Sequence, residues 1–425
     1  MRASHGYATG VICLFLRLVL TAGVSLRAVP RVLRTINAAL GLSLPVPDWT
    51  TGRLWLLRLG HAMLIAQCAV ADDWIWLIDH SVQIGTEKCL VILGIRASDL
   101  PERGQALRHE DMELIELLPA SSWTRPQVCA ALEQAAQRTG CVPRAIVDDH
   151  GVDLSGGVAL FQQKHPQAKI AEIYDAKHKS ACLLKGRLEK DVRWREFQSH
   201  IAQTRCAVQQ TELAFLTPPG PKPKARFMNL QGQLDWARRV LANLREPTKI
   251  RQLATVQRLK EKLGWVESFE AQVQEWSQWQ QVVDVTVALV NTQGIYRGVA
   301  DLLERQLPQL DVLCDSAVEL KEQLIGFVRS QEALVGAKER LPGSTEVLES
   351  CFGKFKQLEK QHSRGGFTQL LLGFGAMLSD LSEDVVERAL RASATLDIKH
   401  WVAQKLGLTL FAKRKQAYAS ATELE

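Results

Sequence analysis

The spacing of apolar and polar positions divides the chain into helical and strand-forming stretches. Near the N-terminus apolar side chains recur with the period of a helix, and Gly41 closes the second such stretch. From about residue 72 the pattern changes to apolar runs rich in β-branched and aromatic residues. The pattern predicts helices at about 7–20, 26–40 and 49–59, strands at 74–79, 88–95, 112–118, 144–147 and 168–174, and intervening helices at 126–138 and 158–163.

The order of these elements narrows the fold class. Three strands, a helix, a strand, a helix and a strand is the order of an RNase H-like core, an α/β fold with a mixed five-stranded sheet and flanking helices. Beyond Asp175 helical spacing continues to about Arg340, which predicts an all-α insertion. We expect a helical module at 1–65, the first part of the core at 70–180, the insertion at 181–340, and the final core helices and tail at 341–425.

The N-terminal module has the pattern of a helix-turn-helix. Pro45 and Pro47 lead into its third predicted helix, which carries arginines. In a helix-turn-helix the last helix enters the major groove of DNA. The alternative is a small helical cap that packs on the next domain. The candidate DNA contacts on the third helix are Thr50, Thr51, Arg53 and Arg58.

Positive charge is concentrated in the same part of the chain. The whole chain has a formal net charge of +6, and residues 1–60 hold seven arginines against the single acid Asp48, which accounts for the surplus. A concentrated basic surface suits a polyanion, because each arginine that neutralises a phosphate releases counterions. A solvated basic face without a partner is the alternative.

Neither a membrane anchor nor a disulfide framework is predicted. Arg17 interrupts the apolar stretch at 11–20, and no run reaches the roughly 18 apolar residues that span a bilayer. The nine cysteines are scattered without a CxxC pair, so we expect reduced core residues instead of a zinc knuckle. These features favour a cytosolic protein.

Carboxylates follow two of the predicted strands. Asp79 ends the first apolar run, and Asp148 and Asp149 end the run at 144–147. A charge at the end of a buried strand is costly unless it is solvated, paired or bound to metal. Two central strands that each end in Asp would place hard oxygen ligands side by side, which suits two Mg²⁺ or Mn²⁺ ions that clamp a phosphodiester.

A third carboxylate is expected from a helix beside those strands. The segment at 343–356 predicts one, with Ser344 as its N-cap and Leu348, Phe352 and Phe355 on one face. Glu349 lies at the edge of that apolar stripe. Each acid taken singly is as consistent with a surface or capping residue, and it is their combination in this order of elements that indicates a site.

These segments resemble a known family. STEVLESCFGKFK is similar to the helix that carries the last acid of the DDE triad in bacterial insertion-sequence transposases, including Mutator-like and hAT-like enzymes with a helical insertion. IVDDHGVDL resembles the strand motif of the second acid, and WLIDHSVQIG that of the first. The resemblance covers most of the chain and implies Asp79, Asp149 and Glu349 as catalytic metal ligands. Asp148, where the family often has a small polar residue, remains the alternative to Asp149.

Further residues enter through the same resemblance. YDAKHK is similar to a polar motif that lies near DNA in related transposases, which implies a role for His178, although Asp175 as N-cap of a helix explains the motif as well. Trp276 in the insertion is a candidate for stacking on an extruded base, with core packing as its alternative. Lys354 and Lys356, which follow Glu349, are candidate phosphate contacts.

The resemblance implies a DNA transposase that binds terminal inverted repeats and performs metal-dependent strand cleavage and strand transfer into target DNA. Synapsis of two element ends implies a homodimer or larger assembly. A nuclease of the same fold that does not join DNA, an inactive transposase-derived DNA-binding protein, and a helical scaffold are the alternatives.

Overall fold

The computed structural model describes residues 6–84, 87–220, 227, 230–247, 254–307, 313–359, 367–406 and 416–418. The chain folds as two compact units. Unit 1 combines Met1–Ile173 with Ser344–Glu425, and unit 2 is Tyr174–Gly343. Unit 2 begins and ends close to the insertion expected at 181–340.

Unit 1 is built on a mixed five-stranded sheet with strand order β3-β2-β1-β4-β5. Strand β2 pairs with β1 and with β3 in antiparallel fashion, and β1 pairs with β4 in parallel. The predicted order of strands and helices is confirmed. The elements are β1 Trp74–Ile84, β2 Glu87–Arg96, β3 Glu113–Ala120, α4 Arg125–Thr139, β4 Ala145–Asp148, α5 Val152–Lys164 and β5 Ala171–Tyr174.

Both faces of the sheet are covered, which explains the long apolar runs. Alternate residues of a strand point to opposite faces. Trp74, Trp76 and Ile78 of β1 belong to one core cluster, which includes apolar residues of α4 and α5. Ile75 and Leu77 are equally buried on the opposite face. Helix α13 (Glu346–Glu359) packs against β1, and none of its residues belongs to the α4 and α5 cluster, so α13 lies on the face of Ile75 and Leu77.

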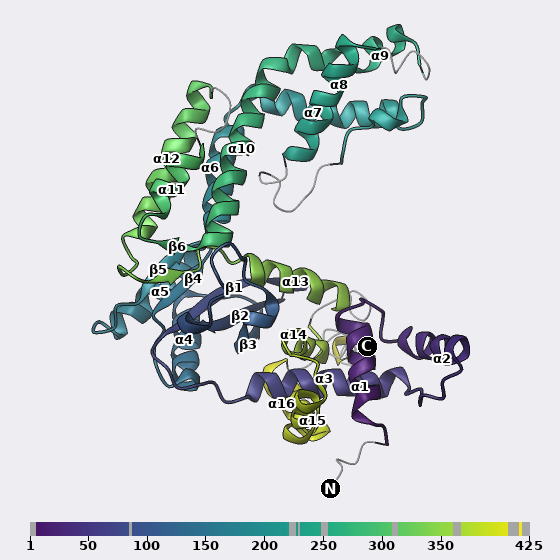
Figure 1. Cartoon of the computed structure of the whole chain (residues 1–425), viewed down its shortest axis with the longest axis vertical. Coiled ribbons are helices and arrows are strands. Elements are labelled where there is room, and N and C mark those ends of the chain that lie inside the picture. Colours follow the sequence, from purple (N-terminus) through teal and green to yellow (C-terminus); the bar gives the residue numbers. More distant parts are fainter. Residues whose placement is uncertain are drawn as a thin grey trace. The chain divides into compact units, whose positions relative to one another are not determined.

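The three predicted N-terminal helices are present, but they do not stand alone. They are α1 Thr9–Leu20, α2 Val29–Leu40 and α3 Trp49–Ile65. Helix α3 packs on the C-terminal helices α14 (Gly373–Met377), α15 (Glu383–Ala392) and α16 (Thr395–Lys405), and the two ends of the chain form one helical group in unit 1 (Figure 1). Backbones approach closely at Gly60, where an added Cβ would lie 1.7 Å from the carbonyl oxygen of Leu372.

Unit 2 is mainly helical, as predicted. The 24-residue helix α10 (Glu270–Gln293) contacts α6, α11 and α12 as well as α8 (Figure 1). A two-stranded sheet of β6 (Ile295–Tyr296) and β7 (Arg340–Leu341) was not predicted, because strands of two residues have no periodic pattern. The other helices are α6 Ala176–Leu188, α7 Val192–Val208, α8 Gln231–Arg245, α9 Val256–Leu263, α11 Val299–Gln306 and α12 Asp315–Glu332.

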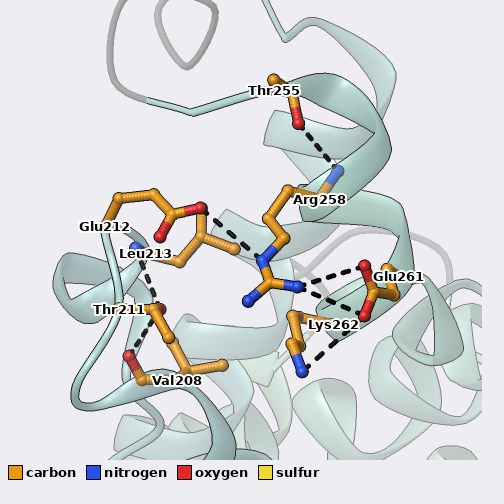
Figure 2. A network of polar contacts seen from close by, with 8 residues as sticks. All are labelled: Val208, Thr211, Glu212, Leu213, Thr255, Arg258, Glu261 and Lys262. Atoms are coloured by element: carbon orange, nitrogen blue, oxygen red, sulfur yellow. Dashed lines mark hydrogen bonds and ion pairs between the residues drawn. The ribbon is translucent and has the colours of Figure 1, made fainter.

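A polar network fixes α9 within unit 2 (Figure 2). The backbone N–H of Arg258 donates to the Thr255 hydroxyl, which caps the helix. The Arg258 guanidinium pairs with Glu212 in the loop after α7 at 3.6 Å and with Glu261 on its own helix at 3.3 Å. Because these ion pairs are exposed, each contributes little to the stability of the fold.

The structure also bears on the expectations about membranes and cysteines. Among the helices in the described ranges, none has both the length and the apolar composition needed to cross a membrane. All nine cysteines are described, and each is a free thiol. Burial raises the pKa of the Cys351 thiol to about 11, and such a thiol is inert.

Candidate functional site

Asp79 is a buried carboxylate at the centre of the sheet. It lies on β1 opposite Val91 of β2, and its exposed fraction is 5%. Alternation along β1 places it on the face of Ile75 and Leu77, where α13 packs. The pairing of β1 with β2 shifts register directly after Asp79. Such irregularities re-aim side chains and are common beside functional sites.

The parallel register of β1 and β4 relates Asp79 to the second pair of acids. Leu77 pairs with Val147, so the same register continued by two residues sets Asp79 beside Asp149. Asp149 directly follows β4 and is half-buried, and its Oδ1 accepts from the N–H of Gly151 at 2.8 Å. Asp148 is fully buried and, by alternation, lies on the opposite face with Ile146. The register therefore groups Asp149, and not Asp148, with Asp79.

Glu349 lies in the first turn of α13. The Ser344 hydroxyl accepts from the N–H of Glu346 at 3.1 Å, in keeping with the expected cap. Leu348, Phe352 and Phe355 are buried as predicted, whereas Glu349 is exposed at the edge of their stripe. The three predicted carboxylates thus come from three elements that meet on one side of the sheet.

A second group of ionisable side chains lies at the C-terminal end of strand β4. The sequence analysis did not predict this group. Asp148, His150 and Glu172 each offer a ligand atom, and these atoms all lie within 4.8 Å of one another. Burial raises the pKa of the Glu172 carboxyl to about 7. The sequence signal is faint, because Glu172 interrupts an apolar strand 22 positions after His150.

The predicted DNA contacts on α3 divide into two kinds. Thr50 is exposed and Thr51 half-buried at the start of the helix, where the Asp48 carboxylate accepts from the N–H and hydroxyl of Thr50; these bonds lower the pKa of Asp48. Arg58 instead donates to the carbonyl oxygens of Ser393, at 2.6 Å, and Leu390. Burial lowers the pKa of Arg53, with the Glu359 carboxylate opposing that effect. Both arginines are thus engaged inside unit 1.

Two exposed arginines lie on one side of α2, a placement that the sequence reasoning did not predict. Arg31 and Arg34 are three residues apart on the helix, and the exposed Arg27 lies two residues before the helix begins, over the Trp49 ring. No acidic residue occurs before Asp48, and α2 lies at the outside of the helical group (Figure 1). The spacing was visible in the sequence, but only the structure shows which face of α2 is buried.

Lys354 borders a cleft in unit 1. The cleft has a volume of about 280 Å³, and its polar lining residues are Thr21, His109, Glu110, Lys354 and Gln357. Lys354 Nζ lies 3.2 Å from each ring nitrogen of His109. Burial first, and then the lysine charge, lower the pKa of His109. Lys356 is half-buried on the same helix. Lys354 therefore contacts the His109 ring at the border of the cleft.

The remaining predicted residues belong to unit 2. The Asp175 carboxylate accepts from the N–H of His178 at 2.7 Å and caps α6, as the capping alternative expected, while His178 itself is exposed. Trp276 is fully buried, donates to Asp191 at 3.0 Å and packs edge-on against Trp194 at 4.9 Å between ring centroids. Trp276 thus packs in the core of unit 2.

Comparison with models of known protein families gives no match, and no curated protein sequence matches the chain.

Proposed function

We propose that this chain is a DDE-type DNA transposase with an RNase H-like core, in which Asp79, Asp149 and Glu349 form the catalytic triad. The observation that carries the proposal is the register of β1 and β4, in which Leu77 pairs with Val147 two residues before Asp79 and Asp149, together with the packing against β1 of α13, the helix of Glu349. The strand order β3-β2-β1-β4-β5, with β1 parallel to β4, supports the RNase H-like core.

The donor set fits Mg²⁺ or Mn²⁺. These ions prefer carboxylate oxygens, and Asp79, with an exposed fraction of 5%, is the kind of charge that a bound cation stabilises. Two such ions would supply charge stabilisation at the attacking and leaving oxygens of a phosphodiester. Asp79 and Asp149 are held by strands and by the turn at Gly151, so these two ligands need little rearrangement. Glu349, exposed in the first turn of α13, would complete the set from the helix side.

The substrate class follows from charge. The exposed arginines Arg31 and Arg34 of α2 present positive charge, with the Asp48 carboxylate close to Arg34, and Lys354 is an exposed cation five residues after Glu349 on α13. Contacts of this kind bind the phosphate backbone and position DNA without reading its sequence. Thr50 and Thr51 remain the candidates for base contacts.

The test compares Glu349→Gln with Glu346→Gln on a supercoiled plasmid that carries the ends flanking this gene, with Mg²⁺, Mn²⁺ or EDTA. Glu346 lies in the same first turn of α13 and is half-buried, which makes it a matched control. We expect Glu349→Gln to lose strand transfer by at least about 10³-fold while it still binds the ends, and Glu346→Gln to stay within about tenfold of wild type.

Three outcomes would redirect the proposal. Cleavage by the wild type without joined products identifies a nuclease of the same fold. DNA binding without any metal-dependent product identifies an inactive DNA-binding protein. Substantial transfer by Glu349→Gln removes Glu349 from the triad.

A further inference from the structure

Asp148, His150 and Glu172 surround one point at the end of β4. His150 Nε2 lies 3.6 Å from an oxygen of Asp148 and 3.5 Å from Oε1 of Glu172. Both separations exceed the usual hydrogen-bond range of 2.7–3.2 Å. They match the edge of a tetrahedron around a cation, because ligands about 2.1 Å from a Zn²⁺ ion are about 3.4 Å apart.

The two carboxylates are positioned by the sheet. Asp148 is the last residue of β4 and is fully buried, and Glu172 is in β5, the neighbouring strand. The side chain of Glu172 is 19% exposed, yet its Oε1 is buried and receives no hydrogen bond from the described residues. A buried carboxyl oxygen in this condition avoids that cost by taking up a proton or by binding a cation.

The imidazole is positioned by an unusual backbone conformation. His150 has φ of 55° and is, within the described ranges, the one non-glycine residue in the left-handed region. That conformation costs of order 1–3 kcal/mol and persists where the surroundings hold it. Here it turns the chain back after β4, so that the ring of His150 reaches both carboxylates.

We propose that Asp148, His150 and Glu172 bind a divalent transition-metal ion, in the first instance Zn²⁺. The combination of one imidazole nitrogen with two carboxylate oxygens suits Zn²⁺ better than Mg²⁺, which prefers oxygen ligands alone. The ion clamps the end of β4 to β5. By alternation along β4 this site lies on the opposite face of the sheet from Asp79, so it is separate from the proposed triad and does not depend on it.

The test measures Zn²⁺ bound to the full-length protein after chelator treatment and dialysis. We expect the variant Asp79→Asn/Glu349→Gln, which removes two of the triad ligands, to keep one tightly bound Zn²⁺ per chain. His150→Ala and Glu172→Gln should each weaken this binding at least about tenfold in a chelator-competition titration. Loading with Co²⁺ should give visible absorption bands that disappear in both variants.

His165→Ala is the matched control, because His165 Nε2 also lies 3.1 Å from a carboxylate, that of Glu133, in a half-buried pair of the same unit. It should bind Zn²⁺ like the wild type.

Far-UV circular dichroism checks folding, and His150→Gln replaces His150→Ala if the latter is unfolded. Equal Zn²⁺ affinity in the wild type and a folded His150 variant overturns the proposal, as does absence of tight Zn²⁺ from the wild type. Loss of all Zn²⁺ from the Asp79→Asn/Glu349→Gln protein would assign the ion to the triad instead.

Discussion

Leu77 of β1 and Val147 of β4 face each other in a parallel pairing, two residues before Asp79 and Asp149 respectively. This register decides which of the two neighbouring acids after β4 joins Asp79. A slip of one residue would exchange Asp148 and Asp149 between the faces of the sheet, because side chains alternate with a period of two. The same apolar pairing precedes both acids, and we propose a different site for each.

Magnesium should stabilise the wild type through Asp79. A ligand that binds only the folded state adds about 2.7 kcal/mol at a concentration 100 times its Kd. Thermal unfolding of Asp79→Asn, measured with and without Mg²⁺, should show little of the increase in Tm seen for the wild type. Asp153→Asn, which changes an acid in the first turn of α5, is the control and should keep the increase. An equal Mg²⁺ effect on Asp79→Asn would argue against metal at that carboxylate.

The α2 arginines should account for part of the salt dependence of DNA binding. Each phosphate contact contributes about 0.9 to the slope of log K against log salt concentration. Arg31→Ala/Arg34→Ala should lower that slope by about 1.8 and weaken binding to any duplex sequence, as measured by fluorescence anisotropy. Arg391→Ala is the control, because it removes an exposed helical arginine that already pairs with Glu387. The slope of log K against log salt concentration should be unchanged in this variant. An unchanged slope in the double variant would mean that Arg31 and Arg34 do not contact DNA phosphates.

Glu359 should make the stability of unit 1 depend on pH. Its exposed fraction is 2%, and burial raises its pKa above the ordinary value of 4.5, against the lowering effects of Thr368 and Arg53. The folded chain therefore holds this proton more tightly than the unfolded chain. The contribution to stability is present below about pH 4.5 and is lost as the pH rises through the folded-state pKa. Glu359→Gln should remove this loss. In urea denaturation, the free energy of unfolding of the variant should therefore rise relative to that of the wild type as the pH increases from 4.5 to 8. A difference that does not vary with pH would contradict the assignment.

Local sequence patterns predicted much of the fold because the strands have strong signals. Trp74 and Trp76 belong to an apolar run whose two faces are both buried, and Gly41 closes α2 at φ of 64° as expected. The triad candidates could also be named, since strand ends and a helix edge are sequence features. The Asp148, His150 and Glu172 cluster could not, because it depends on β5 lying next to β4 and on the left-handed backbone of His150.

The packing of the N-terminal helices on the C-terminal helices could not be predicted from the sequence for a similar reason. Apolar periodicity shows that α3 has a buried face but not what covers it. Arg58 and Gly60 meet chain segments more than 300 residues away, at Ser393 and Leu372. Only tertiary packing joins these positions.

Gly60→Ala should therefore disrupt the helical group in unit 1. A Cβ at this position would lie 1.7 Å from the Leu372 carbonyl oxygen and 2.6 Å from its carbon, and both are backbone atoms that a rotamer change cannot move. Overpacking costs typically 1–3 kcal/mol, and more where backbones must separate. We expect a lower Tm and faster proteolysis of the N-terminal helices. Gly353→Ala on α13, where no atom lies within 4 Å of the added Cβ, should instead be neutral or stabilising by about 0.5–1 kcal/mol. If both variants unfold like the wild type, α3 is not held closely against the C-terminal helices.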